Sequence, residues 1–100
     1  MIEKIINDIN YRLDEDNLTA EVMENEDYEG DIIIPETIMF NDIIYSVTSI
    51  GEGAFFGCES LITINYTGTI AQWNQMTLGE DWRWDVPAKV VHCTDGDVEI

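Results

Sequence analysis

Basic residues are almost missing from this sequence. Four lysines and arginines stand against 21 aspartates and glutamates, which gives a formal net charge of −17. Residues 13–82 hold no lysine or arginine and 15 of the 21 acids. Because such a chain repels nucleic acid and anionic membranes, we expect neither to be bound directly. Basic protein surfaces and cations are the favoured partners; the alternative is that the acids only solvate a small domain.

Residues able to perform catalysis are also scarce. The one histidine, His92, is next to Cys93, and adjacent residues of a strand point to opposite faces of a sheet. Two structural residues are therefore a better interpretation than a cysteine–histidine nucleophile. Two cysteines are too few for a disulfide framework, so we expect Cys58 and Cys93 to be thiols.

The motifs of metal and phosphate sites are incomplete. Residues 14–18 begin like a calcium-binding loop, but Leu18 occupies a ligand position and Thr19 replaces the turn glycine. Residues 95–99 carry acids around a glycine, a composition that turns also use. No lysine follows the glycines of residues 51–57, so no phosphate loop is predicted there. We expect a protein that is not an enzyme and holds no metal or cofactor.

Long apolar runs and targeting signals are missing as well. No stretch approaches the roughly 20 apolar residues of a membrane helix. The first ten residues carry acids inside their apolar run and lack a small-residue cleavage site. These features predict a cytoplasmic location. A length of 100 residues with 45% hydrophobic residues predicts one domain, residues 1–100, with a thin margin of stability.

Short apolar runs with a period of two, separated by turn residues, predict a mainly β chain. The expected strands are residues 9–13, 18–22, 31–35, 61–64 and 89–93. The first two form an N-terminal hairpin, and residues 37–47 form a second hairpin with Asn41-Asp42 at its tip. Residues 1–8 are expected to be weakly helical or frayed.

The C-terminal third has a different character. Thr69 is a suitable N-cap, and the apolar spacing after it predicts a short helix over residues 70–76. Residues 78–87 are expected to form an irregular loop, and residues 94–97 a turn. Upstream, G-D-I-I-I-P (30–35) and S-L-I-T-I-N (60–65) recur 30 residues apart, a spacing typical of solenoid repeats. So few repeats need caps at both ends.

The segment Tyr45–Ile64 resembles the repeat of BspA-like leucine-rich-repeat proteins. The family pattern I-G-x-x-A-F-x-G-C-x-S-L is matched at Ile50, Gly51, Ala54, Phe55, Gly57, Cys58, Ser60 and Leu61. The resemblance covers roughly residues 10–97, with the segments before and after this repeat similar to an opening strand and a closing unit.

The resemblance implies a mainly β, leucine-rich-repeat-like solenoid with short helices. Strands and hairpins over residues 9–47 would cap its N-terminal end, residues 48–66 would form a single truncated repeat, and residues 67–100 a C-terminal cap of helix and strand. Ile50, Leu61 and Ile64 would point into the core. Phe55 would fill the bend, and Cys58 would stack between turns. Surface adhesion or binding of host proteins are the roles implied by the family.

Acidic clusters are the candidate binding residues. They are Asp14, Glu15, Asp16, Glu24, Glu26, Asp27, Glu29 and Asp31. Alternate carboxylates of an extended segment lie about 6.5–7 Å apart on one face, and duplex DNA also presents closely spaced negative charges. Trp82 and Trp84 are candidate interface anchors, whereas Trp73 is predicted to be core.

The sequence therefore predicts a non-enzymatic protein–protein interaction module that is a monomer or a weak homo-oligomer. Its partner would have a basic surface. In the specific form of this hypothesis, the protein is an intracellular inhibitor that occupies the nucleic-acid-binding surface of an enzyme, as acidic anti-restriction and anti-CRISPR proteins of phages do. The alternative is a fragment or relative of a bacterial surface leucine-rich-repeat protein that binds host or cell-surface proteins.

Overall fold

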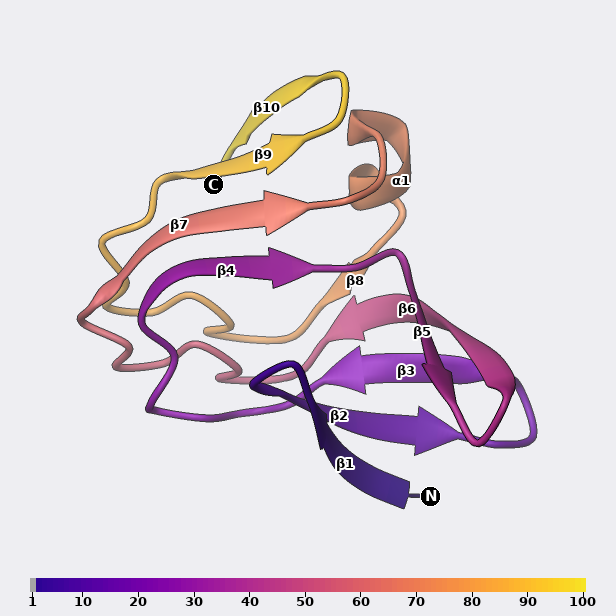
Figure 1. Cartoon of the computed structure of the whole chain (residues 1–100). Helices are drawn as coiled ribbons and strands as arrows, with labels where there is room; N and C mark the ends of the chain where they lie inside the picture. Colours follow the sequence, from indigo (N-terminus) through magenta and orange to yellow (C-terminus); the bar gives the residue numbers. More distant parts are fainter. Residues whose placement is uncertain (1) are drawn as a thin grey trace.

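Two β-sheets enclose the core in the computed structural model, which describes residues 2–100 (Figure 1). The elements in chain order are β1 (Ile2–Ile6), β2 (Ile9–Asp14), β3 (Thr19–Val22), β4 (Gly30–Ile34), β5 (Thr37–Phe40), β6 (Ile43–Ile50), β7 (Leu61–Tyr66), α1 (Ile70–Asn74), β8 (Thr77–Leu78), β9 (Val90–Cys93) and β10 (Gly96–Glu99). One sheet has the order β1-β2-β3-β6-β5, and β8 also pairs with β6. The other has the order β10-β9-β7-β4.

Parallel pairings turn this chain into a solenoid. Strand β6 lies between β3 and β8 in one sheet, and β7 lies between β4 and β9 in the other. Each turn consists of a strand in the first sheet, a bend, and a strand in the second sheet. The turns are β3–β4, β6–β7 and β8–β9. The predicted fold class, a mainly β leucine-rich-repeat-like solenoid with capped ends, is confirmed.

The structure contains three turns where the sequence revealed one clear repeat. The bends differ in length, and this difference hides the other two repeats in the sequence. Ile32 is ten positions after Val22 across the first bend. Ile64 and Ile50, which lie opposite these two residues in the sheets, are fourteen positions apart. Strand β7 also carries an extra residue, because Gly30 lies opposite Leu61 but the next residue lies opposite Thr63.

The three bends, residues 23–29, 51–60 and 79–89, stack on one side of the molecule, the left side of Figure 1. Backbone hydrogen bonds connect the second bend to the third. The N–H of Phe55 donates to the carbonyl of Trp82 at 2.8 Å, and the N–H of Gly57 donates to the carbonyl of Trp84 at 3.1 Å. These bonds satisfy the buried amides of the bends and hold the turns in register.

An aromatic column runs through the stacked bends. Tyr28, Phe55 and Trp82 each come from a different turn, 27 residues apart, and all are buried. Their ring centroids are 5.3 Å and 6.0 Å apart, and both pairs meet edge to face. The resemblance correctly placed Phe55 in the bend. Trp82, a candidate interface anchor in the sequence, is buried in this column, and it also lines a pocket at the third bend.

The other residues that the resemblance places in the core or between turns are also interior. Ile50, Leu61 and Ile64 are buried, as is Cys58. The Cys58 thiol donates to the carbonyl of Asn25 in the neighbouring bend at 3.2 Å. Burial raises the pKa of this thiol, and the nearby acids raise it further. Cys58 therefore packs between turns as a protonated side chain.

The expectation that residues 1–8 are helical or frayed was wrong for the residues that the structure describes. Ile2–Ile6 form strand β1, antiparallel to β2. Asn7 and Asp8 connect the two strands with φ angles of 50° and 68°, the left-handed region that a two-residue hairpin turn requires. Pairing with β2 supplies the hydrogen bonds that this short segment lacks alone.

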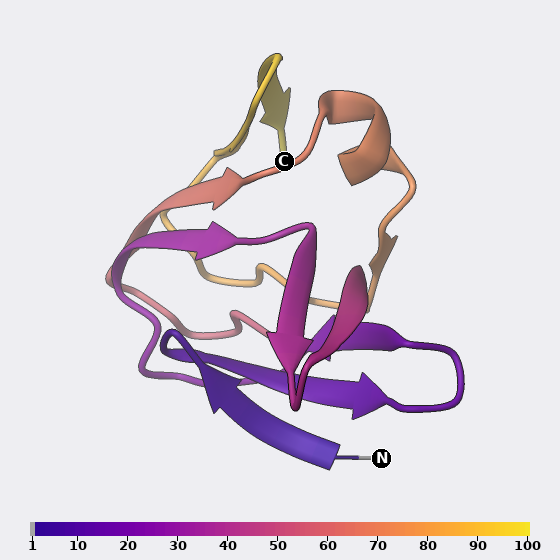
Figure 2. The ribbon, with the colours of Figure 1, turned by 45° about the vertical axis from the view of Figure 1, so that its right-hand side comes forward.

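The C-terminal cap combines the predicted helix, which ends at Asn74 and not at residue 76, with an unexpected strand. Thr69 caps α1 in a capping box, in which its side chain accepts from the N–H of Gln72 and the Gln72 side chain accepts from the N–H of Thr69. Trp73 is buried, as predicted. Beyond β9 the chain turns back as β10, antiparallel to β9, where only a turn and a tail were expected. Hairpin β5–β6, helix α1 and the β9–β10 turn lie on the side opposite the bends (Figure 2).

Candidate functional site

A groove of about 860 Å³ opens at the N-terminal end of the solenoid. We call it the N-terminal groove. It lies between the β1–β2 turn and strand β4, and the first bend forms part of its wall. Its buried apolar and aromatic lining residues are Ile9, Tyr11, Tyr28, Ile32 and Ile38, and its exposed acidic ones are Asp8, Asp27, Glu29 and Asp31. The groove therefore combines an apolar floor with an acidic rim.

The two tyrosines of the floor are neutral. The hydroxyl of Tyr28 accepts from the N–H of Asn10 at 3.0 Å and donates to the carbonyl of Met23 at 2.9 Å. Burial raises the pKa of Tyr28 to about 12. Burial likewise raises the pKa of Tyr11 well above its usual value. A ligand in the groove would meet uncharged, largely apolar surface below and carboxylates at the rim.

None of the four basic residues lines the groove. Lys4 lies over the ring of Phe40, with its amine 5.3 Å from the ring centroid. Arg12 is 3.8 Å from a carboxylate oxygen of Glu21 on the neighbouring strand. The other two, in the third bend, are at the opposite end of the solenoid. The negative field of the rim is thus not offset by a basic side chain within the groove.

The structure brings together only part of the acidic set predicted from sequence. Asp27, Glu29 and Asp31 line the groove, whereas Glu24 and Glu26 belong to the same bend but not to the lining.

The remaining three acids, Asp14, Glu15 and Asp16, lie at the β2–β3 turn, at the other end of β3 (Figure 1). The carboxylate of Asp14 accepts hydrogen bonds from the backbone of Asp16 and from the backbone and side chain of Asn17. These bonds lower the pKa of Asp14, the side-chain bond from Asn17 contributing most. Asp14 therefore has a structural role in its turn.

Of the residues that line the groove, the sequence reasoning named only Asp27, Glu29 and Asp31 as binding residues, and those it missed include Asp8, Ile5 and Ile33. Asp8 belongs to a segment that was expected to be helical or frayed, and Ile5 precedes it. Ile33 is 59% exposed although it belongs to an apolar run. The signal that was available is the Asn7-Asp8 pair, which has the same turn chemistry as the recognised hairpin tip at Asn41-Asp42.

The fold matches that of a leucine-rich protein. A solved structure described as a leucine rich cell surface protein from Faecalibacterium prausnitzii A2-165 superimposes with a TM-score of 0.69 at 21% sequence identity. The match covers 95% of this chain and 24% of that chain, so this chain spans about a quarter of the other's length. No protein-family model matches the sequence. No curated protein matches it either.

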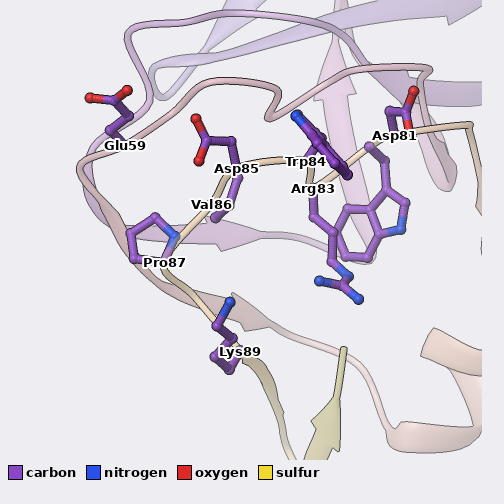
Figure 3. Close-up of a pocket in the computed structure, with 9 residues that line it drawn as sticks. Glu59, Asp81, Arg83, Trp84, Asp85, Val86, Pro87 and Lys89 are labelled. Atoms are coloured by element: carbon purple, nitrogen blue, oxygen red, sulfur yellow. The ribbon is translucent and has the colours of Figure 1, made fainter.

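A second pocket, of about 760 Å³, lies at the third bend (Figure 3). Trp84 is 61% exposed at this C-terminal pocket. The charged ends of Arg83 and Lys89 lie in the lower part of the view, and the carboxylates of Glu59 and Asp85 lie above them (Figure 3). With both signs of charge at its wall, this pocket selects less strongly for the charge of a ligand than the N-terminal groove does.

His92 and Cys93 lie on opposite faces of β9. The Nδ1 atom of His92 is 2.8 Å from a carboxylate oxygen of Asp97 on β10. Burial raises the pKa of the Cys93 thiol, and nearby aspartates raise it further. Within residues 2–100, no three histidine, cysteine or acidic side chains converge in a way that would hold a metal ion. In the same range, no helix is long and apolar enough to span a membrane.

Proposed function

We propose that this chain is a non-enzymatic binding module of the BspA-like leucine-rich-repeat type, which holds a basic segment of a partner protein in the N-terminal groove. One observation carries the proposal: four carboxylates surround an apolar floor, and no basic residue is present in the lining. The fold of a leucine rich cell surface protein, which this chain resembles, is compatible with this proposal.

The two parts of the groove supply different components of binding. Carboxylates at the rim attract and orient a basic partner, and they raise its association rate at low salt. Burial of apolar surface against the floor slows dissociation, since most affinity differences lie in that rate. A ligand that is only charged would use the first component, and one that is only apolar would use the second.

A continuous row of negative charge, as in a nucleic-acid mimic, has less support than the groove. Asp14–Asp16 and Asp27–Asp31 lie at opposite ends of β3, a four-residue strand that spans about 13 Å. Between them β3 presents Glu21, which is close to Arg12. We therefore propose that the partner binds as a side-chain-bearing segment inserted in the groove. Inhibition of a nucleic-acid-binding enzyme in the cytoplasm, and binding at a cell surface, are both compatible with this mode.

Neutralising the rim tests the proposal. The groove variant combines Asp27→Asn, Glu29→Gln and Asp31→Asn, three exposed positions at which the substitution preserves shape. The probe is a fluorescein-labelled synthetic peptide of alternating lysine and valine, and the measurement is fluorescence anisotropy at low and high salt. We expect the groove variant to bind at least about tenfold more weakly and to show a weaker salt dependence.

A matched control separates the groove from net charge. The control variant combines Glu15→Gln, Asp16→Asn and Asp42→Asn, which remove an equal number of negative charges from exposed turns outside the groove. We expect this control to retain affinity within about threefold of the unmodified protein. Equal losses in the two triple variants would mean that only total charge matters, and the groove would be rejected as the binding site.

A further inference from the structure

Strand β4 leaves one edge of its sheet open beside the N-terminal groove. It is the last strand in the order β10-β9-β7-β4, and its pairing partner within residues 2–100 is β7. Asp31, Ile32 and Ile33 of this strand line the groove. An edge strand with unpaired backbone groups is a ready template for another strand.

The backbone hydrogen bonds show which residues direct their backbone groups to the open edge. The N–H of Gly30 donates to Ser60 at 2.7 Å, and the carbonyl of Ile34 accepts from Thr67 at 3.1 Å, both on the β7 side. Because backbone groups alternate in direction along a strand, those of Asp31 and Ile33 point away from β7. An added strand would therefore bond to residues 31 and 33.

The surroundings of this edge specify the side chains of an added strand. Ile32 and Ile34 are buried and point inward, whereas Asp31 and Ile33 are exposed and point outward. Residues of an added strand would alternate in the same way. Its inward residues would cover the apolar floor at Ile9, Tyr28 and Ile38. Its outward residues would lie beside the carboxylates of the rim.

We propose that β4 accepts an extended segment of a partner protein as an additional strand, in which lysine or arginine alternates with β-branched apolar residues. This inference rests on the proposed function and adds the binding mode. Charge complementarity selects the occupant, because the groove lining holds four acids and no base. β-branched residues suit the inward positions since they favour strands.

A second copy of this chain does not fit the same requirement. Two β4 edges paired with each other would bring Glu29 and Asp31 of both copies together, and each chain carries a net charge of −17. Residues 13–82 contain no basic residue to alternate with apolar ones. The occupant we infer is therefore a different protein.

Substitutions at Ile33 test the edge directly. Ile33→Pro removes the N–H that faces the groove and leaves the β4–β7 pairing intact, as proline is tolerated on an edge strand. Ile33→Ala removes the side chain but keeps the N–H. With the lysine–valine peptide as probe, we expect Ile33→Pro to bind at least about fivefold more weakly than Ile33→Ala. Equal affinities of the two variants would overturn the added strand.

Modified peptides provide a test that does not depend on the folding of a variant. In one peptide the backbone amides of the lysines are N-methylated, and in the other those of the valines. Only one alternating set of amides faces β4 in an added strand. We expect one of the two peptides to lose binding to the unmodified protein by at least about tenfold and the other to retain it. Equal binding of both peptides would overturn strand addition.

The outcomes separate this inference from the proposed function. If the triple groove variant loses affinity but both methylated peptides bind equally, the groove binds basic segments through side chains alone and β4 adds no strand. If the triple groove variant binds like its control, the proposed function itself fails. Sedimentation velocity with and without peptide tests the second-copy alternative, and a concentration-dependent dimer that the peptide dissociates would overturn the choice of a different protein.

Discussion

Replacing Phe55 with alanine measures how strongly the stacked turns support one another. The side chain is fully buried between Tyr28 and Trp82, one residue from each neighbouring turn. Truncation of a buried phenylalanine costs about 3–5 kcal/mol, and each aromatic pair contributes about 0.5–1.5 kcal/mol beyond its buried area. We expect Phe55→Ala to lower the free energy of unfolding by at least about 4 kcal/mol, a large share of the roughly 5–15 kcal/mol typical of domains.

The next residue in the chain provides a matched control. Phe56 is 50% exposed, so Phe56→Ala removes the same atoms from a half-exposed position. We expect this variant to lose less than about 1 kcal/mol. Urea unfolding followed by tryptophan fluorescence reports on both variants, because the ring of Trp82 lies beside that of Phe55. The ring centroids of Trp73 and Trp82 are 5.8 Å apart. The midpoint should shift at constant slope.

Two results would refute this reasoning. Similar losses for Phe55→Ala and Phe56→Ala would show that the aromatic column does not stabilise the turns. A small loss for Phe55→Ala alone would mean that the bends collapse around the cavity at little cost. Should the alanine variant be too unstable to purify, Phe55→Leu retains most of the volume, and we expect it to cost about 1–2 kcal/mol.

Three further predictions concern the turns, the groove and the helix. Gly79→Ala should cost about 2–3 kcal/mol, seen as a lower melting temperature, because an added Cβ would clash with the backbone nitrogen of Glu52. The folded pKa of Tyr28, raised by burial to about 12 from 10, means that its contribution to stability is complete below pH 10. As the pH rises from 10 to about 12, that contribution should fall by about 3 kcal/mol. Tyr28→Phe, compared by urea unfolding across this range, should therefore lose about that much less stability than the unmodified protein, while Tyr11, whose pKa is also raised by burial, still contributes a loss in both. Thr69→Ala should remove the capping bond to Gln72 and cost about 1 kcal/mol of thermal stability, whereas Thr69→Ser should be nearly neutral.

Local chemistry made much of the fold predictable. The period of two in residues 9–13 and 18–22, the tip at Asn41-Asp42 and the cap at Thr69 all depend on neighbours in sequence, and all were found in the structure. The repeat motif around Phe55 was also visible, because one bend carries nearly all of its residues. Such features can be predicted without knowing which distant residues pack against them.

The missed features depend on contacts between distant segments. The first and third bends lack the motif of the second, so only the 27-residue spacing of Tyr28, Phe55 and Trp82 connects them. Trp82 lies in a loop without periodicity, and its place in the core comes from stacking on Phe55. Likewise, Asp8 meets Asp31 at one groove only because β1 and β2 extend the first sheet beside β4.

The two sides of the solenoid differ in how freely the length of their connecting segments can change. On the side of the bends, hydrogen bonds from turn to turn hold the spacing. On the opposite side, the connections are a hairpin, a helix and a tight turn, and none repeats another. The hairpin tip at Asn41-Asp42 lies beyond the residues of β6 that pair with β3. A foreign peptide inserted at this tip would extend the β5–β6 hairpin without changing the distance between the solenoid turns. The hairpin end of the protein is therefore a suitable place to present inserted sequences.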